Sequence, residues 1–120
     1  MRRVASCQPE RAVFHVGHNV GSEPRWTHTQ IELAWRKVRS QLELTPDASF
    51  VAQRGVWTDP EGHAVSEVST RIEVLKTWET PSFDFTNTCL NTAEELAREL
   101  KQEAVVVDMG PGGAVWTVSP

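Results

Sequence analysis

Apolar and polar residues recur at two different spacings along this chain, and these spacings predict its strands and helices. β-Branched and aromatic residues are enriched between residues 11 and 20, which predicts a strand. From Thr27 to about Leu42 apolar residues recur at helical spacing, and Thr27 with Gln30 forms a capping box that would begin the helix. Residues 50–58 predict a strand, and after an Asp-Pro-Glu-Gly turn the residues from about 64 to 78 alternate apolar and polar positions, so residues 50–78 predict a β-hairpin with one packed face.

The second half of the chain has a less regular pattern. Residues 79–91 show no period, and we expect a long loop there. Thr92 with Glu95 forms a second capping box, and apolar residues at helical spacing follow it. The apolar run at residues 104–109 predicts a buried strand, and residues 114–118 predict a short edge strand.

The predicted order is therefore β-α-β-β-α-β, followed by one extra C-terminal edge strand. This order is typical of an α+β ferredoxin-like sandwich, in which two helices cover one face of an antiparallel sheet. We expect a single domain over residues 11–120, preceded by a flexible N-terminal tail at residues 1–10. The polar residues between 67 and 73 would leave the other sheet face open to solvent, a ligand or a second subunit.

The amino-acid composition argues against two kinds of partner for such a domain, nucleic acids and membranes. The net charge is −4 and no run of Lys or Arg extends beyond Arg2-Arg3, so we do not expect nucleic-acid binding. No apolar run approaches the length of a membrane span, and the two Cys form no CxxC pair, so we expect a cytoplasmic protein without a membrane partner. Five Trp and four Phe in a chain this short predict aromatic surface at a subunit interface, and hence a homo-oligomer.

Three of the four His residues lie in the predicted strand, the glycine-bounded loop after it and the helix start. His15 and His18 would lie on opposite faces of the strand, so we expect no metal site and no cofactor. The helix N-terminus at His28 offers free N–H groups to an anion, and Gly17 would let another group approach the backbone closely. The alternative is that these residues only hold the loop and cap the helix.

The polar face of the hairpin is a second candidate site. Arg54, Trp57 and Arg71 would bind a small ligand there by bidentate contacts and stacking. Ion pairs across the strands are the alternative explanation for the same charges. With the loop residues included, the predicted ligand-binding residues are Gly17, His18, Asn19, Arg25, His28, Arg54, Trp57 and Arg71.

No motif in the sequence indicates nucleophilic catalysis, since it has no GxSxG and no Cys–His pair in a recognisable context. We therefore expect a non-enzymatic binding protein that takes a small anionic or nucleotide-like ligand, or a host protein, as an oligomer. Two alternatives stay open. One is a small hydrolase or lyase with His18 or His28 as general base, and the other is a pure protein–protein interaction module.

Four segments resemble small uncharacterised proteins of bacteriophages and prophages: Val16–Val20, Thr27–Thr29, Ser69–Val74 and Leu96–Val105. The resemblance covers about residues 13–109. It implies an accessory protein that acts against host defences, and it assigns no functional residue.

Overall fold

The computed structural model describes residues 11–58, 61–76, 82–110 and 113–120. Outside these ranges lie the predicted tail at residues 1–10, the first two residues of the predicted Asp-Pro-Glu-Gly turn, residues 77–81, which include the start of the predicted loop, and residues 111–112. The elements in chain order are β1 (Arg11–Gly17), β2 (Asn19–Val20), β3 (Glu23–Pro24), α1 (His28–Gln41), β4 (Ser49–Thr58), β5 (Ala64–Leu75), α2 (Ser82–Glu99), β6 (Val105–Asp108) and β7 (Val115–Val118).

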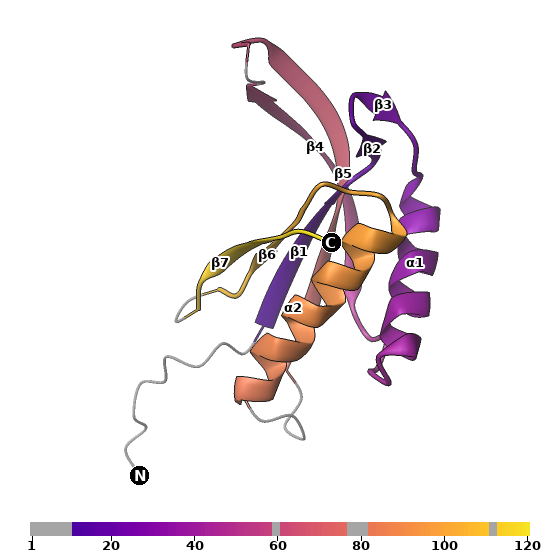
Figure 1. The fold of residues 1–120 in the computed structure, drawn as a ribbon, viewed down its shortest axis with the longest axis vertical. Coiled ribbons are helices and arrows are strands. Elements are labelled where there is room, and N and C mark those ends of the chain that lie inside the picture. Colours follow the sequence, from indigo (N-terminus) through magenta and orange to yellow (C-terminus); the bar gives the residue numbers. More distant parts are fainter. Residues whose placement is uncertain (1–10, 59–60, 77–81, 111–112) are drawn as a thin grey trace.

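The main sheet is antiparallel with the order β4-β5-β1-β6-β7, and β2 pairs with β3 in a separate small hairpin. Both helices cover the same face of the main sheet (Figure 1). This arrangement confirms the predicted ferredoxin-like α+β sandwich and its extra C-terminal edge strand. No helix in the described part of the chain is long and apolar enough to span a membrane.

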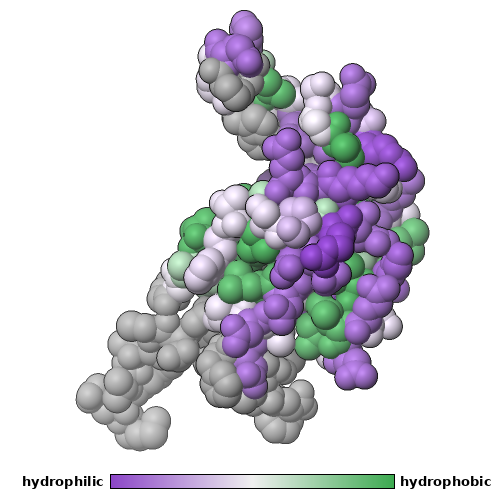
Figure 2. All heavy atoms as spheres, in the orientation of Figure 1, coloured by the Kyte–Doolittle hydropathy of each residue, from purple (hydrophilic) through white to green (hydrophobic). Residues whose placement is uncertain are grey.

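The core lies between the sheet and the helices. Inward-facing residues of β1 and β5 meet the apolar stripe of α1, which begins at the predicted capping box of Thr27 and Gln30. Phe14 packs edge-on against Trp35 with ring centroids 5.0 Å apart, and the indole N–H of Trp35 donates a hydrogen bond to the Pro46 carbonyl. The outer surface of the helices is largely hydrophilic (Figure 2).

The second helix is longer than the sequence pattern predicts. α2 begins at Ser82, so residues 82–91 of the predicted loop are helical and the predicted helix start at Thr92 is wrong. Thr92 lies inside the helix, where its Oγ1 donates a hydrogen bond to the Thr88 carbonyl at 2.7 Å and accepts one from Arg39. A Thr hydroxyl can form its hydrogen bond with a carbonyl one helical turn earlier as readily as with a backbone N–H at a cap position.

Cys89 of α2 is completely buried in the core, and this burial raises the pKa of its thiol to about 12. Because the thiolate is the reactive form, we expect Cys89 to be alkylated by iodoacetamide at least about 100-fold more slowly in the native protein than in guanidinium. Peptide mass spectrometry of samples quenched at intervals measures both rates. Rapid native modification of Cys89 would contradict the packing of α2 on the sheet.

The β4–β5 hairpin extends beyond the rest of the sheet (Figure 1). β1 pairs with β5 only from Ser69 to Leu75, whereas the residues of β5 before Ser69 pair with β4 alone. Glu67 therefore lies just past the point where β1 ends at Gly17. This junction, where the hairpin leaves the sheet, is also where the chain turns from β1 toward β2.

Candidate functional site

Backbone hydrogen bonds fix the turn that follows β1. The His18 N–H donates to the Val68 carbonyl of β5 at 3.0 Å. The His18 carbonyl accepts two hydrogen bonds from the returning loop, one from the Arg25 N–H at 3.0 Å and one from the Trp26 N–H at 2.8 Å. His18 therefore connects the start of the loop between β1 and α1 both to the end of that loop and to β5 of the hairpin.

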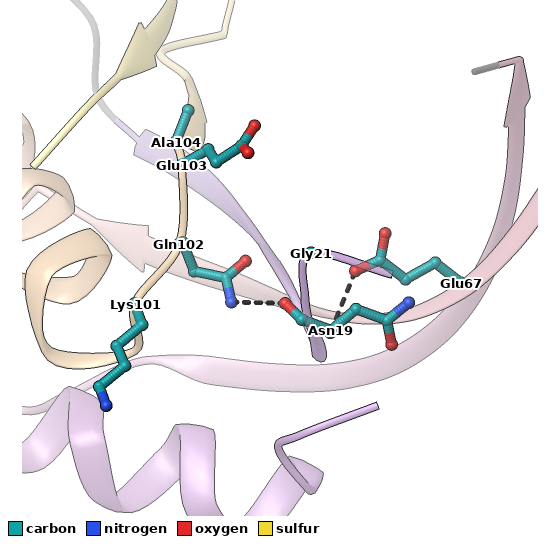
Figure 3. Close-up of a pocket in the computed structure, with 7 residues that line it drawn as sticks. All are labelled: Asn19, Gly21, Glu67, Lys101, Gln102, Glu103 and Ala104. Carbon is teal, nitrogen blue, oxygen red and sulfur yellow. Dashed lines mark hydrogen bonds between the residues drawn. The ribbon is translucent and has the colours of Figure 1, made fainter. Parts of the chain in front are cut away.

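A cleft of about 410 Å³ opens beside this turn. Its lining comes from β2, the turn after it, β5 and the segment between α2 and β6 (Figure 3). The lining residues are Asn19, Gly21, Glu67, Lys101, Gln102, Glu103 and Ala104. A volume of this size is typical of sites for small molecules.

Glu67 is held in the cleft by groups that are distant in sequence. Its Oε1 accepts a hydrogen bond from the backbone N–H of Asn19 at 3.2 Å, and the Asn19 carbonyl accepts one from Gln102 Nε2 at 2.8 Å (Figure 3). A Cβ on Gly17 would lie 2.4 Å from the same Oε1. The sequence predicted that another group approaches the backbone at Gly17, and the structure confirms this, with the Glu67 carboxylate as that group.

The end of α2 brings the other wall of the cleft into place. Lys101 adopts a left-handed conformation with φ of 53°, and the Gln102 N–H donates back to the Ala97 carbonyl at 2.9 Å. This is the hydrogen bond of a Schellman ending, here without the usual glycine, which costs about 1 kcal/mol of backbone strain. Trp26 holds the same helix end, because its Nε1 donates to the Leu100 carbonyl at 2.8 Å.

The side chains of the cleft carry two carboxylates, on Glu67 and Glu103, and one ammonium, on Lys101. Lys101 extends away from Glu67 in Figure 3. The two carboxylates outnumber the one ammonium group, so the charge of the cleft favours a ligand with a positive group. Among the residues described, no group of three or more His, Cys, Asp or Glu could hold a metal ion.

His18 and His28 do not line the cleft. Both side chains turn inward to Thr70 on β5, with distances of 2.8 Å from His18 Nε2 and 3.0 Å from His28 Nδ1 to the Thr70 Oγ1. His18 is only 8% exposed and Thr70 is completely buried. Desolvation lowers the pKa of His18 from its ordinary value, and the neighbouring His28 lowers it further.

This lowered pKa predicts a loss of stability in mild acid. The unfolded chain binds a proton at His18 below about pH 6.5, whereas the folded chain resists it, so the free energy of unfolding should fall by up to about 1.4 kcal/mol per pH unit from pH 6.5 down to the folded pKa. The pKa of His15, lowered mainly by burial, adds an effect of the same sign. Urea unfolding at several pH values measures the slope. A His18→Gln variant that retains the full slope would contradict the assignment to His18.

The remaining predicted site residues lie outside the cleft. The Arg25 guanidinium stacks over Trp26, 4.2 Å from the ring centroid. Arg71 forms an ion pair with Glu73 at 3.5 Å on the open sheet face, which fits the alternative of ion pairing there.

The predicted grouping of Arg54 with Arg71 is wrong. Arg54 pairs with Val68 in the β4–β5 register, and side chains alternate along a strand, so the two Arg lie on opposite faces of the sheet. Trp57 pairs with Val65, and its side chain lies outside what the structure describes.

No protein-family model and no curated protein sequence matches the chain. Two solved structures match it over its whole length. One is a phage SAM lyase in complex with S-methyl-5'-thioadenosine, with 32% sequence identity, a TM-score of 0.82 and 95% of that chain covered. The other is a phage SAM lyase in the apo state, with 30% identity, a TM-score of 0.81 and 96% of that chain covered. The chain belongs to the phage SAM lyase family.

Membership of the SAM lyase family changes two expectations from the sequence. The prediction of a non-enzymatic binding protein is wrong, because both relatives are enzymes, and the alternative of a small lyase is the better one. The predicted link to phage proteins is confirmed, but these relatives are not uncharacterised. A small ligand is supported too, since one SAM lyase of the family holds a nucleoside.

Proposed function

We propose that this protein is a lyase that cleaves SAM (S-adenosylmethionine) and releases S-methyl-5'-thioadenosine, and that the cleft beside Glu67 is part of its active site. One observation carries the proposal, namely the full-length match at 32% identity to a SAM lyase holding that nucleoside. The acidic cleft supports it, because SAM has a sulfonium and an ammonium group and therefore suits carboxylate partners.

The chemistry needs no nucleophile from the protein. When the bond between the sulfonium sulfur and the γ-carbon of the methionine part breaks, both electrons go to sulfur and a neutral thioether leaves. Because a lyase does not add water, the bond that the γ-carbon loses is replaced by a bond formed within the substrate itself. Either the substrate's own carboxylate oxygen attacks it and closes a five-membered lactone, or a base such as a carboxylate of the cleft takes a proton from the β-carbon and an alkene forms. The position of His18 and His28 outside the cleft means that neither would be the base in the alkene route, and the lactone route needs no general base.

In such a reaction the protein contributes mainly by orienting the substrate. We assign the Glu67 carboxylate to the ammonium group of the methionine part, and the side-chain amide of Asn19 to polar groups of the nucleoside. Fixing the ammonium group directs the adjacent carboxylate toward the back of the γ-carbon, and such orientation of reacting groups is a large source of rate acceleration. A protein carboxylate that contacted only the sulfonium sulfur would stabilise the charged substrate more than the transition state, because the sulfur loses its positive charge as the bond breaks.

The test is product analysis. Purified protein incubated with SAM should form S-methyl-5'-thioadenosine and a four-carbon product, which liquid chromatography with mass spectrometry identifies as lactone or alkene. A preparation that is folded by circular dichroism and leaves SAM intact would overturn the proposal. The host-protein partner, the homo-oligomer, the anti-defence role and the cytoplasmic location stay predictions from the sequence.

A further inference from the structure

Two histidines share one buried hydroxyl behind the cleft. Thr70 Oγ1 lies 2.8 Å from His18 Nε2 and 3.0 Å from His28 Nδ1, and the three residues come from the turn after β1, from α1 and from β5. We propose that this His18–Thr70–His28 cluster consists of positioning residues that hold Asn19 and Glu67 in the geometry of the cleft. Its kinetic consequence rests on the proposed function, whereas its structural consequence does not.

The hydrogen-bonding capacity of the cluster explains why all three members are needed. A Thr hydroxyl donates one hydrogen bond and can accept two. With both imidazoles neutral, the hydroxyl donates to one ring nitrogen and accepts from the N–H of the other. Removing the hydroxyl leaves two ring nitrogens without this partner in an environment where unpaired polar groups are costly. The His18 ring then no longer has a fixed place against β5.

The cluster acts on the cleft through the backbone, because Thr70 and Glu67 lie at opposite-facing positions of β5. His18 stands between Gly17, whose missing side chain leaves room for the Glu67 carboxylate, and Asn19, whose N–H binds that carboxylate. The backbone hydrogen bonds of His18 hold the same turn, so we infer that loss of the ring contact loosens the turn and lets the two residues that determine where Glu67 lies move. The Asn19 carbonyl also holds Gln102, so both walls of the cleft depend on this anchor.

Thr70→Val and Thr70→Ser separate positioning from stability. Thr70→Val has nearly the shape of Thr without the hydroxyl, whereas Thr70→Ser retains the hydroxyl. For SAM cleavage, we expect Thr70→Val to raise KM about tenfold and Thr70→Ser to stay within about twofold of the wild type. Partial unfolding would instead lower kcat and leave KM unchanged, because the molecules that remain folded have normal sites. A Thr70→Val protein with wild-type KM would overturn the proposal.

Hydrogen exchange of the Asn19 amide tests the same proposal without turnover. We expect this amide to exchange at least about tenfold faster in Thr70→Val and at the wild-type rate in Thr70→Ser, with amides of β6 unchanged in both. Unchanged exchange at Asn19 in Thr70→Val would also overturn the proposal. If the wild-type protein does not cleave SAM, the proposed function fails, and the exchange measurement still decides whether the cluster positions the cleft.

Discussion

Glu67→Gln should lower kcat/KM for SAM cleavage at least about a hundredfold, which corresponds to nearly 3 kcal/mol of transition-state stabilisation. The substitution keeps the size of the side chain, and its amide oxygen can still accept the hydrogen bond from the Asn19 N–H. What it removes is the negative charge that we assign to the ammonium group of the substrate, and charged hydrogen bonds are about twice as strong as neutral ones. Steady-state rates of S-methyl-5'-thioadenosine formation, together with the melting temperature, measure the effect.

Glu94→Gln provides the matched control. Glu94 lies on α2, where it forms a largely exposed ion pair with Arg98 at 3.2 Å, and this substitution changes the net charge by the same amount. We expect activity within about twofold of the wild type, because exposed ion pairs contribute little. If Glu67→Gln is as active as Glu94→Gln, Glu67 has no role in binding the substrate, and Glu103 would be the carboxylate to test next.

The fold could be predicted where one local pattern had one structural meaning. The alternation along β5 did, and the structure confirms it together with the capping box at Thr27. The helix start at Thr92 could not be predicted, because a Thr followed three residues later by Glu occurs at a cap and inside a helix alike. Phe85, Cys89 and Ala93 continue the buried stripe of α2 backward, but polar residues of low helix propensity between them obscured the period.

Of the residues at the cleft, only those at the end of β1 and just after it could be predicted from the sequence. Gly17 drew attention because glycine inside a strand indicates a close approach, and Asn19 because it begins the loop. Glu67 is not among the predicted ligand-binding residues, because a carboxylate at a polar strand position has the same pattern as any solvated charge. What distinguishes it is contact with residues about 50 positions earlier in the chain, and no spacing within β5 reveals that contact. The sequence also does not show that His18 and His28 both turn inward to Thr70.

Gly17→Ala should abolish most of the activity while the fold stays intact. The added Cβ would lie 2.4 Å from Glu67 Oε1, and the carboxylate is the free end of a flexible side chain, so it moves aside at little cost. Alanine is also better tolerated in a strand than glycine, so we expect the free energy of unfolding to change by less than about 1 kcal/mol. The same displacement should reduce kcat/KM by about as much as Glu67→Gln, roughly a hundredfold, because orientation at the site is lost. Urea unfolding and steady-state kinetics measure the two effects separately.

The double variant Gly17→Ala/Glu67→Gln decides whether the glycine acts through the carboxylate. If it does, the second substitution has little left to remove, and the double variant should be only slightly less active than either single one. Two independent effects would instead multiply to a loss on the order of ten-thousandfold. A multiplied loss would show that Gly17 serves the site in another way, for example by letting the substrate itself approach the backbone of β1. If the double variant is nearly as active as either single variant, Gly17 is needed because its missing side chain leaves space for the Glu67 carboxylate.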